Sequence, residues 1–234
     1  MEFFRDNGYS IVEKFISPQD VEKYIELLEK ICDNPVGIPE ENIFRMDSQN
    51  NQLIKQIQYL NESNEILKQF SFKVRDYIRS EFGNESFDIV NCQMFAKPPS
   101  CKPTSAHQDG WYFSQRGSVR NNNWNNNPIT CWVALQDITL DNSCLYYVPG
   151  SHNYGLLNHD KTGSIHRIRT GVPGVSVYLP DYNLYQKQEI PMLIKAGDML
   201  IHDEYLIHRS GHNITSSTRR ALTCILFPNI SSTY

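Results

Sequence analysis

The sequence lacks the features that mark nucleic-acid-binding, membrane and secreted proteins. Its 22 lysines and arginines are outnumbered by 26 aspartates and glutamates, and a net charge of −4 with a pI near 6.0 gives no broad positive field. No apolar run reaches the length of a membrane span. The opening MEFFRDNGYSIVEK lacks the basic and then apolar layout of a signal peptide. We therefore expect no nucleic-acid partner, no membrane partner and a cytoplasmic location.

Cysteine motifs are also missing. The six cysteines are scattered and include no C-x-x-C pair, which predicts reduced thiols rather than a disulfide frame or a zinc knuckle: Cys32, Cys92, Cys101, Cys131, Cys144 and Cys224. The 234 residues have 40% hydrophobic and 21% charged content, which is ordinary for a globular protein. This length predicts one domain over residues 1–234.

Residues 1–83 are predicted to form a helical region beside the main fold. Residues 9–16 are β-prone and predict a first strand. Ser17 as N-cap and Pro18 at the first position then predict a helix, which ends at Asn34-Pro35. A second amphipathic helix is expected at residues 65–82, with Gly83 as its stop and with this buried face: Ile66, Phe70, Val74, Tyr77 and Ile78. Residues 36–60 are polar and poorly periodic, so no element is predicted there.

Residues 87–230 are predicted to form the β-rich core. Short β-prone segments are separated by Gly, Pro, Asn and Asp turns, at residues 87–97, 129–135, 144–148, 174–179, 190–194, 198–202 and 220–227. Many short strands without intervening helices indicate an antiparallel sandwich or barrel. We expect a mainly β fold with flanking helices, built as a double-stranded β-helix (a cupin-like jelly roll).

Two long loops, residues 114–128 and 150–173, interrupt the strands. Loops of this length are usually functional lids or mobile surface. Together they carry a set of basic side chains: Arg116, Arg120, His159, Lys161, His166, Arg167 and Arg169. Cations at the mouth of a site predict a small-molecule substrate with a carboxylate or phosphate, whereas a solvated basic loop is the alternative.

The first chemistry-bearing motif is His107-Gln108-Asp109, within AHQDGWYF. Residues i and i+2 of a strand point to one face, so this spacing aims an imidazole and a carboxylate at one point. The tripeptide alone is weak evidence, because a histidine that simply bonds to a neighbouring acid explains it equally well.

The second motif spans residues 202–223, HDEYLIHRSGHNITSSTRRALT, and contains His202, His208 and His212 before Arg219 and Arg220. An arginine entering an apolar strand needs an anion, because a buried guanidinium is otherwise costly. Adjacent strand residues point to opposite faces, so either Arg219 or Arg220 faces inward.

These motifs combine into one consistent set. Two neutral imidazoles and one carboxylate on one side of an octahedral ion leave three open positions, which Fe(II) uses for a bidentate 2-oxo acid and O2. The far carboxylate of 2-oxoglutarate then requires a planar, permanently charged fork, which arginine supplies. His107, Asp109, a late histidine and a late arginine therefore predict a mononuclear non-haem Fe(II) oxygenase.

Over nearly its whole length the chain resembles the phytanoyl-CoA dioxygenase family of Fe(II)/2-oxoglutarate oxygenases. The resemblance is carried by FRDNGYSIVEKFISPQDVEKYIELLE, QMFAKPPS, HQDGWYF, DNSCLYYVPGSH, GDMLIHDEYLIHRSGHN and the closing R-x-A strand. In this family the distal iron ligand lies in a His-x-Ser stretch, eleven residues before the arginine that binds 2-oxoglutarate. The resemblance thus implies His107, Asp109 and His208 as iron ligands and Arg219 as the anchor of 2-oxoglutarate.

The resemblance implies further roles. Ser210 would donate its hydroxyl to the 2-oxoglutarate carboxylate, and Trp132 and Gln93 match positions that line the cosubstrate pocket. Trp111 and Tyr112 follow the iron aspartate and would wall the substrate side. For Trp132 and Tyr112, ordinary aromatic core is an equal alternative. His202 is expected either to hydrogen-bond behind the ligands or to lie at the surface.

The expected reaction is hydroxylation of a small metabolite, with O2 consumed and succinate and CO2 released. Related halogenases replace the iron carboxylate with a small residue, so Asp109 favours hydroxylation, desaturation or ring closure. A zinc hydrolase could use the same three ligands, but it would not require Arg219. A cupin-like metalloprotein would show His-x-His, and a non-catalytic metal-binding protein on this scaffold should have lost a ligand or the arginine.

Overall fold

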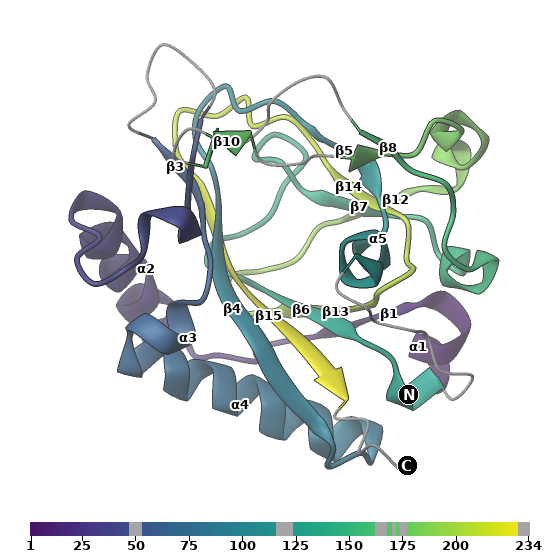
Figure 1. Cartoon of the computed structure of the whole chain (residues 1–234), viewed down its shortest axis with the longest axis horizontal. Helices are drawn as coiled ribbons and strands as arrows, with labels where there is room; N and C mark the ends of the chain where they lie inside the picture. Colours follow the sequence, from purple (N-terminus) through teal and green to yellow (C-terminus); the bar gives the residue numbers. More distant parts are fainter. Residues whose placement is uncertain (47–52, 116–123, 162–167, 170–171, 174–176, 229–234) are drawn as a thin grey trace.

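The computed structural model describes residues 1–46, 53–115, 124–161, 168–169, 172–173 and 177–228. Its strands form a nine-stranded sheet in the order β1-β13-β6-β15-β4-β3-β2-β9-β10, a four-stranded sheet in the order β12-β7-β14-β5, and the pair β11-β8. All named pairings are antiparallel. Figure 1 shows the four-stranded sheet facing one side of the nine-stranded sheet, with α2 and α4 on the other side.

The helices are α1 (Glu2–Asn7), α2 (Pro18–Asp33), α3 (Leu60–Ser63), α4 (Glu65–Phe82) and α5 (Asp109–Ser114). The nine-stranded sheet contains β1 (Tyr9–Val12), β2 (Ile43–Arg45), β3 (Ile54–Ile57), β4 (Phe87–Lys97), β6 (Ile129–Ala134), β9 (Ile168–Arg169), β10 (Val172–Pro173), β13 (Met199–Asp203) and β15 (Arg219–Pro228). The four-stranded sheet contains β5 (Thr104–His107), β7 (Leu145–Tyr147), β12 (Ile190–Met192) and β14 (His208–Ser210), and the pair is β8 (Asp160–Lys161) with β11 (Val177–Tyr178). Short 3-10 turns are η1 (Glu40–Asn42), η2 (Trp124–Asn126), η3 (Ser151–Tyr154), η4 (Tyr182–Leu184) and η5 (Gln186–Gln188).

The two long helices begin and end where their capping residues predict. The Ser17 hydroxyl accepts a hydrogen bond from the Asp20 amide at 3.1 Å, and Pro18 opens α2. The Asn64 side chain caps α4, and Gly83 ends it in the left-handed conformation. The predicted buried face of α4 is wrong at Ile66, which is 39% exposed, whereas its neighbour Leu67 is fully buried. The cap fixes the helical phase, and that phase places position 67 rather than 66 against the sheet.

Several short elements have no clear signal in the sequence. The helix α1 was not predicted, and β2 and β3 lie in the stretch that sequence periodicity leaves unassigned. Strand β3 exists because it extends the large sheet, with Gln56 opposite Phe95 of β4. Strands β5 and β14 are only four and three residues long and largely polar, so they escape a search for apolar strands. Tertiary pairing, rather than local propensity, decides these elements.

The central strands β6 and β13 of the large sheet are buried on both faces. In β6, Cys131 and Val133 belong to the core shared with the helices, whereas Trp132 and Ala134 belong to the core shared with the small sheet. This arrangement explains the nearly continuous apolar run at residues 129–135. The space between the two sheets receives the inward side chains of β6, β13 and β15. None of the described helices is long and apolar enough to cross a membrane.

Candidate active site

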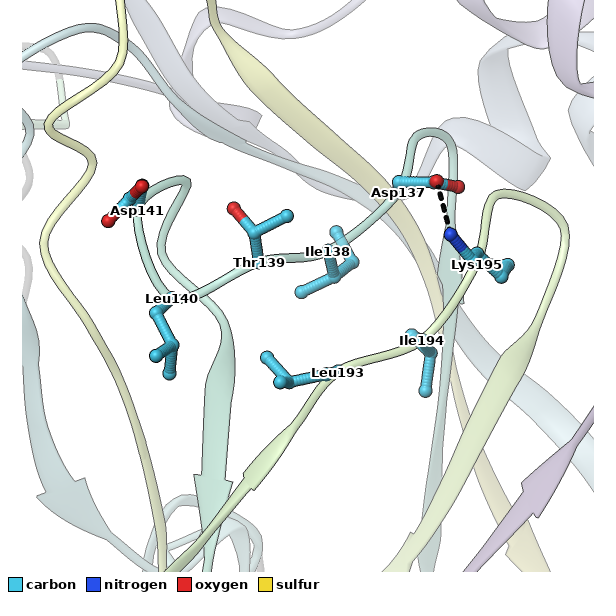
Figure 2. A pocket seen from close by; sticks show the side chains of 8 residues that line it. All are labelled: Asp137, Ile138, Thr139, Leu140, Asp141, Leu193, Ile194 and Lys195. Carbon is cyan, nitrogen blue, oxygen red and sulfur yellow. Dashed lines mark hydrogen bonds and ion pairs between the residues drawn. The ribbon is translucent and has the colours of Figure 1, made fainter.

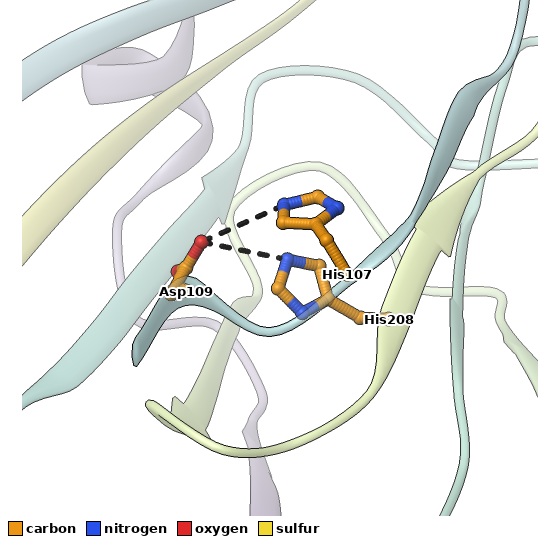
Figure 3. Close-up of side chains that lie close together, drawn as sticks. All are labelled: His107, Asp109 and His208. Carbon is orange, nitrogen blue, oxygen red and sulfur yellow. Dashed lines mark ion pairs between the residues drawn. The ribbon is translucent and has the colours of Figure 1, made fainter. Parts of the chain in front are cut away.

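Three predicted ligands meet between the sheets. His107 ends β5, Asp109 begins α5 and His208 begins β14, and Figure 3 shows their side chains converging. The Nε2 atoms of His107 and His208 each lie 3.7 Å from Asp109 Oδ1. One ligand atom from each residue lies within 4.8 Å of the others, and this is the one such group among the described His, Cys, Asp and Glu residues.

The local geometry of the His-x-Asp motif differs from the expected one. His107 and Asp109 do not share a strand, because β5 ends at His107 and the chain turns into α5 at Gln108. The expectation that strand alternation aligns the two side chains is therefore wrong, although they do meet. Gly110 permits this turn, since a Cβ there would lie 2.4 Å from the ring of Tyr205. The Gly110 amide donates to the Glu204 carbonyl at 2.7 Å.

The two histidines are held with the same ring nitrogen facing Asp109. His107 Nδ1 lies 2.8 Å from the Ser105 carbonyl, and His208 Nδ1 lies 3.0 Å from the Leu206 carbonyl. A carbonyl only accepts, so each Nδ1 carries the proton and each Nε2 presents a lone pair. Burial, with the adjacent His107, lowers the pKa of His208 to about 3. His208 is therefore neutral at physiological pH, as a metal ligand must be.

The Asp109 carboxylate is held in its charged form. Burial alone would raise its pKa, but the adjacent histidines, His208 first and then His107 and His202, outweigh burial and hold the pKa well below the ordinary value. Its second oxygen, Oδ2, accepts a hydrogen bond of 2.7 Å from the Thr130 hydroxyl and lies 3.2 Å from His202 Nε2. Two imidazoles and one carboxylate with this protonation match the donor set of a facial iron site.

Arg219 is buried without a counter-ion. It is 2% exposed, its Nη2 donates to the Ser143 carbonyl at 3.2 Å, and its Nε and Nη1 have no hydrogen-bond partner within the described part of the chain. Among the described residues no carboxylate forms an ion pair with it. Burial lowers its pKa to about 10, so the guanidinium stays charged at neutral pH. A buried cation with free donors fits an anionic ligand such as a carboxylate.

The neighbouring Arg220 differs in having a carboxylate partner. It faces outward and pairs with Glu29 at 3.3 Å. Strand alternation predicts that one of the two arginines faces inward, and Arg219 is the one.

Lys97 stands directly opposite Arg219 across β4 and β15 and was not predicted. Its buried Nζ donates to Thr104 Oγ1 at 2.8 Å and to the Lys102 carbonyl at 3.0 Å. The Ser210 hydroxyl accepts from the Thr104 amide at 3.3 Å, which places Ser210 beside the same group. Lys97 could have been predicted from its spacing to Gln93, because positions 93 and 97 of one strand lie on the same face of the sheet.

The other predicted cosubstrate residues are buried in the large sheet. The guanidinium carbon of Arg219 lies 5.1 Å from the centre of the Trp132 ring. Trp132 also packs in the core between the sheets. Gln93 lies one strand further along the same row, with Thr223 between them, and accepts from the Gln56 side chain at 2.7 Å. Trp132 thus contacts the anion site, whereas Gln93 lies in a polar pair beside it.

Trp111 and Tyr112 lie on α5, next to the triad. The ring centres of Tyr112 and His107 are 5.9 Å apart, and those of Trp111 and Tyr112 are 5.3 Å apart. His159, from the segment after η3, lies 6.2 Å from Trp111 and was not predicted at this position. Gln108 holds this segment, since its side chain bonds to the Gly155 carbonyl and the Leu157 amide.

The remaining sequence candidates separate clearly. His212 is exposed, whereas His202 lies on β13 in contact with Asp109. The side chains of Arg116, Arg120, His166, Arg167 and Arg169 lie outside what the structure describes, so the expected basic mouth rests on sequence alone.

A surface pocket of ≈ 450 Å³ lies elsewhere (Figure 2) and contains none of the predicted site residues. Two turns line it: Asp137, Ile138, Thr139, Leu140, Asp141, Leu193, Ile194 and Lys195. Of its three charged residues, Asp137 and Lys195 already pair at 2.8 Å.

Comparison with known proteins agrees with this geometry. The family model described as phytanoyl-CoA dioxygenase matches residues 4–221. The peroxisomal phytanoyl-CoA dioxygenase of Homo sapiens is 26% identical over 95% of this chain, which spans 66% of the human protein's length. A probable alpha-ketoglutarate-dependent hypophosphite dioxygenase of Stutzerimonas stutzeri is 24% identical over 94% of this chain and 74% of its own length.

Among solved structures, EvdO2 from Micromonospora carbonacea var. aurantiaca, complexed with 2-oxoglutarate, superimposes with a TM-score of 0.71. The match is 19% identical and covers 96% of this chain and 88% of EvdO2. This likeness concerns the fold, and it confirms the predicted cupin-like jelly roll.

Proposed function

Because the chain belongs to the phytanoyl-CoA dioxygenase family, we propose that it is an Fe(II)- and 2-oxoglutarate-dependent oxygenase. One observation carries the proposal. Two imidazoles and a carboxylate converge between the sheets, and a buried arginine beside Trp132 on the same side of the large sheet has two donors, Nε and Nη1, without a hydrogen-bond partner among the described residues. Neither feature alone specifies this chemistry, but together they match a metal and a dicarboxylate cosubstrate.

His107, Asp109 and His208 would hold the iron through Nε2, Oδ1 and Nε2. When bound, the iron with 2-oxoglutarate and O2 supplies an oxidation of a substrate C–H bond, coupled to release of succinate and CO2. The protein residues supply geometry rather than acid or base groups. Their Nδ1 bonds to backbone carbonyls and the Asp109 Oδ2 bonds fix all three side chains before the metal arrives.

Arg219 would bind the far carboxylate of 2-oxoglutarate. Its Nε and Nη1 offer two parallel donors in a dry environment, where a charged bidentate pair is strong. Ser210 would add its hydroxyl, and the Lys97 ammonium would add a second positive charge nearby. Trp132 would wall the cosubstrate beneath the guanidinium, and Gln93 would keep the adjoining polar row in place.

The substrate would be a small metabolite that enters past Trp111 and Tyr112. These two rings flank the His107 side of the triad, where a substrate must lie to be oxidised. We propose an anionic substrate on the basis of the basic loops, and hydroxylation as the reaction because Asp109 is present. Charge reversal of Arg167 and Arg169 tests the substrate charge, since an unchanged KM would contradict it.

Zinc hydrolysis is the main alternative, because zinc accepts the same three ligands. It gives no reason for a buried, unpaired Arg219. A cytoplasmic location remains part of the proposal, and imaging of the tagged full chain tests it.

The decisive experiment is anaerobic titration of the purified protein with Fe(II) and then 2-oxoglutarate. We expect a weak visible charge-transfer band that requires both additions, and succinate formation when O2 is admitted. His208→Ala should abolish the band by losing the metal, and Arg219→Ala by losing the cosubstrate. Wild-type protein that shows neither the band nor succinate would contradict the function, and hydrolytic activity supported by Zn(II) alone would favour the alternative.

A further inference from the structure

The Asp109 carboxylate is hydrogen-bonded by side chains that do not belong to the proposed ligand set. Thr130 of β6 and His202 of β13 stand directly opposite each other in the sheet. Both reach the same carboxylate oxygen, Oδ2, at 2.7 Å and 3.2 Å. The register between two central strands of the large sheet therefore aims two groups at one atom.

The hydrogen-bond pattern of His202 follows from its two neighbours. A carboxylate oxygen only accepts, so the contact between His202 Nε2 and Asp109 Oδ2 places the imidazole proton on Nε2, which donates to Oδ2. His202 Nδ1 lies 2.8 Å from the Tyr147 hydroxyl. An imidazole with its proton on Nε2 has a lone pair on Nδ1, so the Tyr147 hydroxyl donates to Nδ1. The result is a directed chain from Tyr147 through His202 to Asp109.

This chain connects the two sheets. Tyr147 lies on β7 of the small sheet, directly opposite His208 on β14, and His208 in turn lies opposite His107 on β5. His202 and Thr130 belong to the large sheet. Asp109 stands between the two rows, so its carboxylate is fixed relative to both sheets at once.

We propose that His202, oriented by Tyr147, is a positioning residue that holds Asp109 Oδ2 and leaves Oδ1 as the single carboxylate atom presented to the metal. The inference rests on the proposed iron site. Oδ1 already faces Nε2 of both His107 and His208 at 3.7 Å, whereas Oδ2 is hydrogen-bonded to Thr130 and His202. A carboxylate tied in this way would hold a metal through one oxygen.

The test is metal affinity, measured by anaerobic titration with Fe(II) and independently with Co(II). We expect His202→Ala to weaken metal binding by about 10- to 100-fold, the range typical of removing a group behind a ligand. His202→Gln should recover part of the affinity, because its amide can donate near the lost Nε2. Thr130→Val removes the other Oδ2 donor and should weaken binding in the same direction without altering the His202–Tyr147 pair.

A double-mutant cycle separates positioning from mere packing. Tyr147→Phe should weaken metal binding in the wild-type background but add nothing in the His202→Ala background, because Tyr147 acts through His202. His152→Gln is the matched control. His152 is also a buried histidine, and it bonds to the Arg5 carbonyl at 2.9 Å rather than to a ligand. We expect it to lower the melting temperature without changing metal affinity.

The possible failures are distinguishable. Wild-type protein that binds neither metal would contradict the proposed function itself. Wild-type binding with unchanged affinity in folded His202→Ala and Thr130→Val proteins would overturn this inference alone. Additive losses from Tyr147→Phe and His202→Ala would also overturn it, since Tyr147 would then act by another route.

Discussion

The triad and Arg219 occupy the same space between the sheets, but they are prepared for their ligands in opposite ways. Each triad residue has its other polar atom engaged by the protein: Nδ1 of His107 and His208 at carbonyls, and Oδ2 of Asp109 at Thr130 and His202. Arg219 instead keeps two donors without partners. The triad side chains are thus fixed before a metal binds, whereas Arg219 completes its hydrogen bonds when an anion binds.

A second arginine shows what a completed pair looks like in this protein. Arg209, next to His208, donates to both oxygens of Glu189 and lies 3.9 Å from the centre of the Tyr146 ring. Hydrogen bonding to Glu189 raises its pKa above the ordinary value, whereas burial lowers that of Arg219. The sequence could have paired Arg219 in the same way, so its missing partner indicates an external ligand.

Removing the carboxylate of the triad should have the largest effect. Asp109→Ala leaves two neutral imidazoles, and we expect metal binding to fall by more than the about 10- to 100-fold loss caused by removing a group behind a ligand. Anaerobic Fe(II) titration measures the affinity, and circular dichroism verifies the fold. Retention of wild-type affinity in folded Asp109→Ala protein would show that the metal lies elsewhere.

Replacing Arg219 should weaken binding of 2-oxoglutarate without affecting binding of the metal. We expect Arg219→Met to weaken 2-oxoglutarate binding by about 2–5 kcal/mol, the loss typical of a buried charge pair that loses one partner, while Fe(II) affinity stays unchanged. Anaerobic calorimetric titration of the metal-free protein with Fe(II), and then of the loaded protein with 2-oxoglutarate, gives both values. Arg220→Met is the matched control, because Arg220 faces outward to Glu29. Equal losses from the two variants would contradict the inward role of Arg219.

The same replacement, although it weakens cosubstrate binding, should increase the stability of the protein in the absence of cosubstrate. Without cosubstrate, Arg219→Met removes a buried charge with unsatisfied donors, so the free energy of unfolding should rise by about 1–3 kcal/mol. Adding 2-oxoglutarate at 100 times its Kd should stabilise Fe(II)-loaded wild-type protein by about 2.7 kcal/mol and leave Arg219→Met unaffected. Thermal and denaturant unfolding test both expectations. A marked destabilisation of the metal-free variant would mean that Arg219 is already satisfied.

Breaking the ion pair between Arg209 and Glu189 should have the smallest effect on stability, and that effect should depend on pH. Burial would raise the pKa of Glu189, but hydrogen bonds from Arg209 and Tyr182 outweigh it and lower the pKa below the ordinary value of 4.5. A lowered acid pKa stabilises the fold above that ordinary value, and the contribution is lost as the pH falls through the lowered one. Glu189→Gln should therefore cost about 1 kcal/mol or less near neutral pH, and the difference from wild type should shrink below pH 4.5. Urea unfolding at several pH values measures it, and a difference that grows in acid would contradict the pairing.

Sequence reasoning reached those parts of the fold that depend on local chemistry. The caps Ser17, Asn64 and Gly83 mark the ends of the long helices, and only the first and last of these were used in prediction. The short strands β5 and β14 were missed although they carry two of the proposed ligands. Their formation depends on pairing with partners about a hundred residues away, which local patterns do not encode.

The site was predictable where spacing or resemblance supplied the answer. His107, Asp109 and His208 lie together as expected, and Arg219 is buried beside Trp132, although strand parity could not choose Arg219 over Arg220. The contact of His202 with Asp109 depends on the register of β13 against β6 and on β7 in the opposite sheet. The spacing of residues along the sequence does not reveal this contact, so the sequence could not decide whether His202 hydrogen-bonds behind the ligands or lies at the surface.

Asp109 is the first residue of α5, and the same short helix carries Trp111 and Tyr112. A displacement of the carboxylate is thus a displacement of the rings that would face the substrate, because six residues of helix move as one body. Metal loading and substrate recognition then share a free energy of coupling. By reciprocity, a bound ion that changes the affinity for substrate by some factor implies that bound substrate changes the affinity for the ion by the same factor.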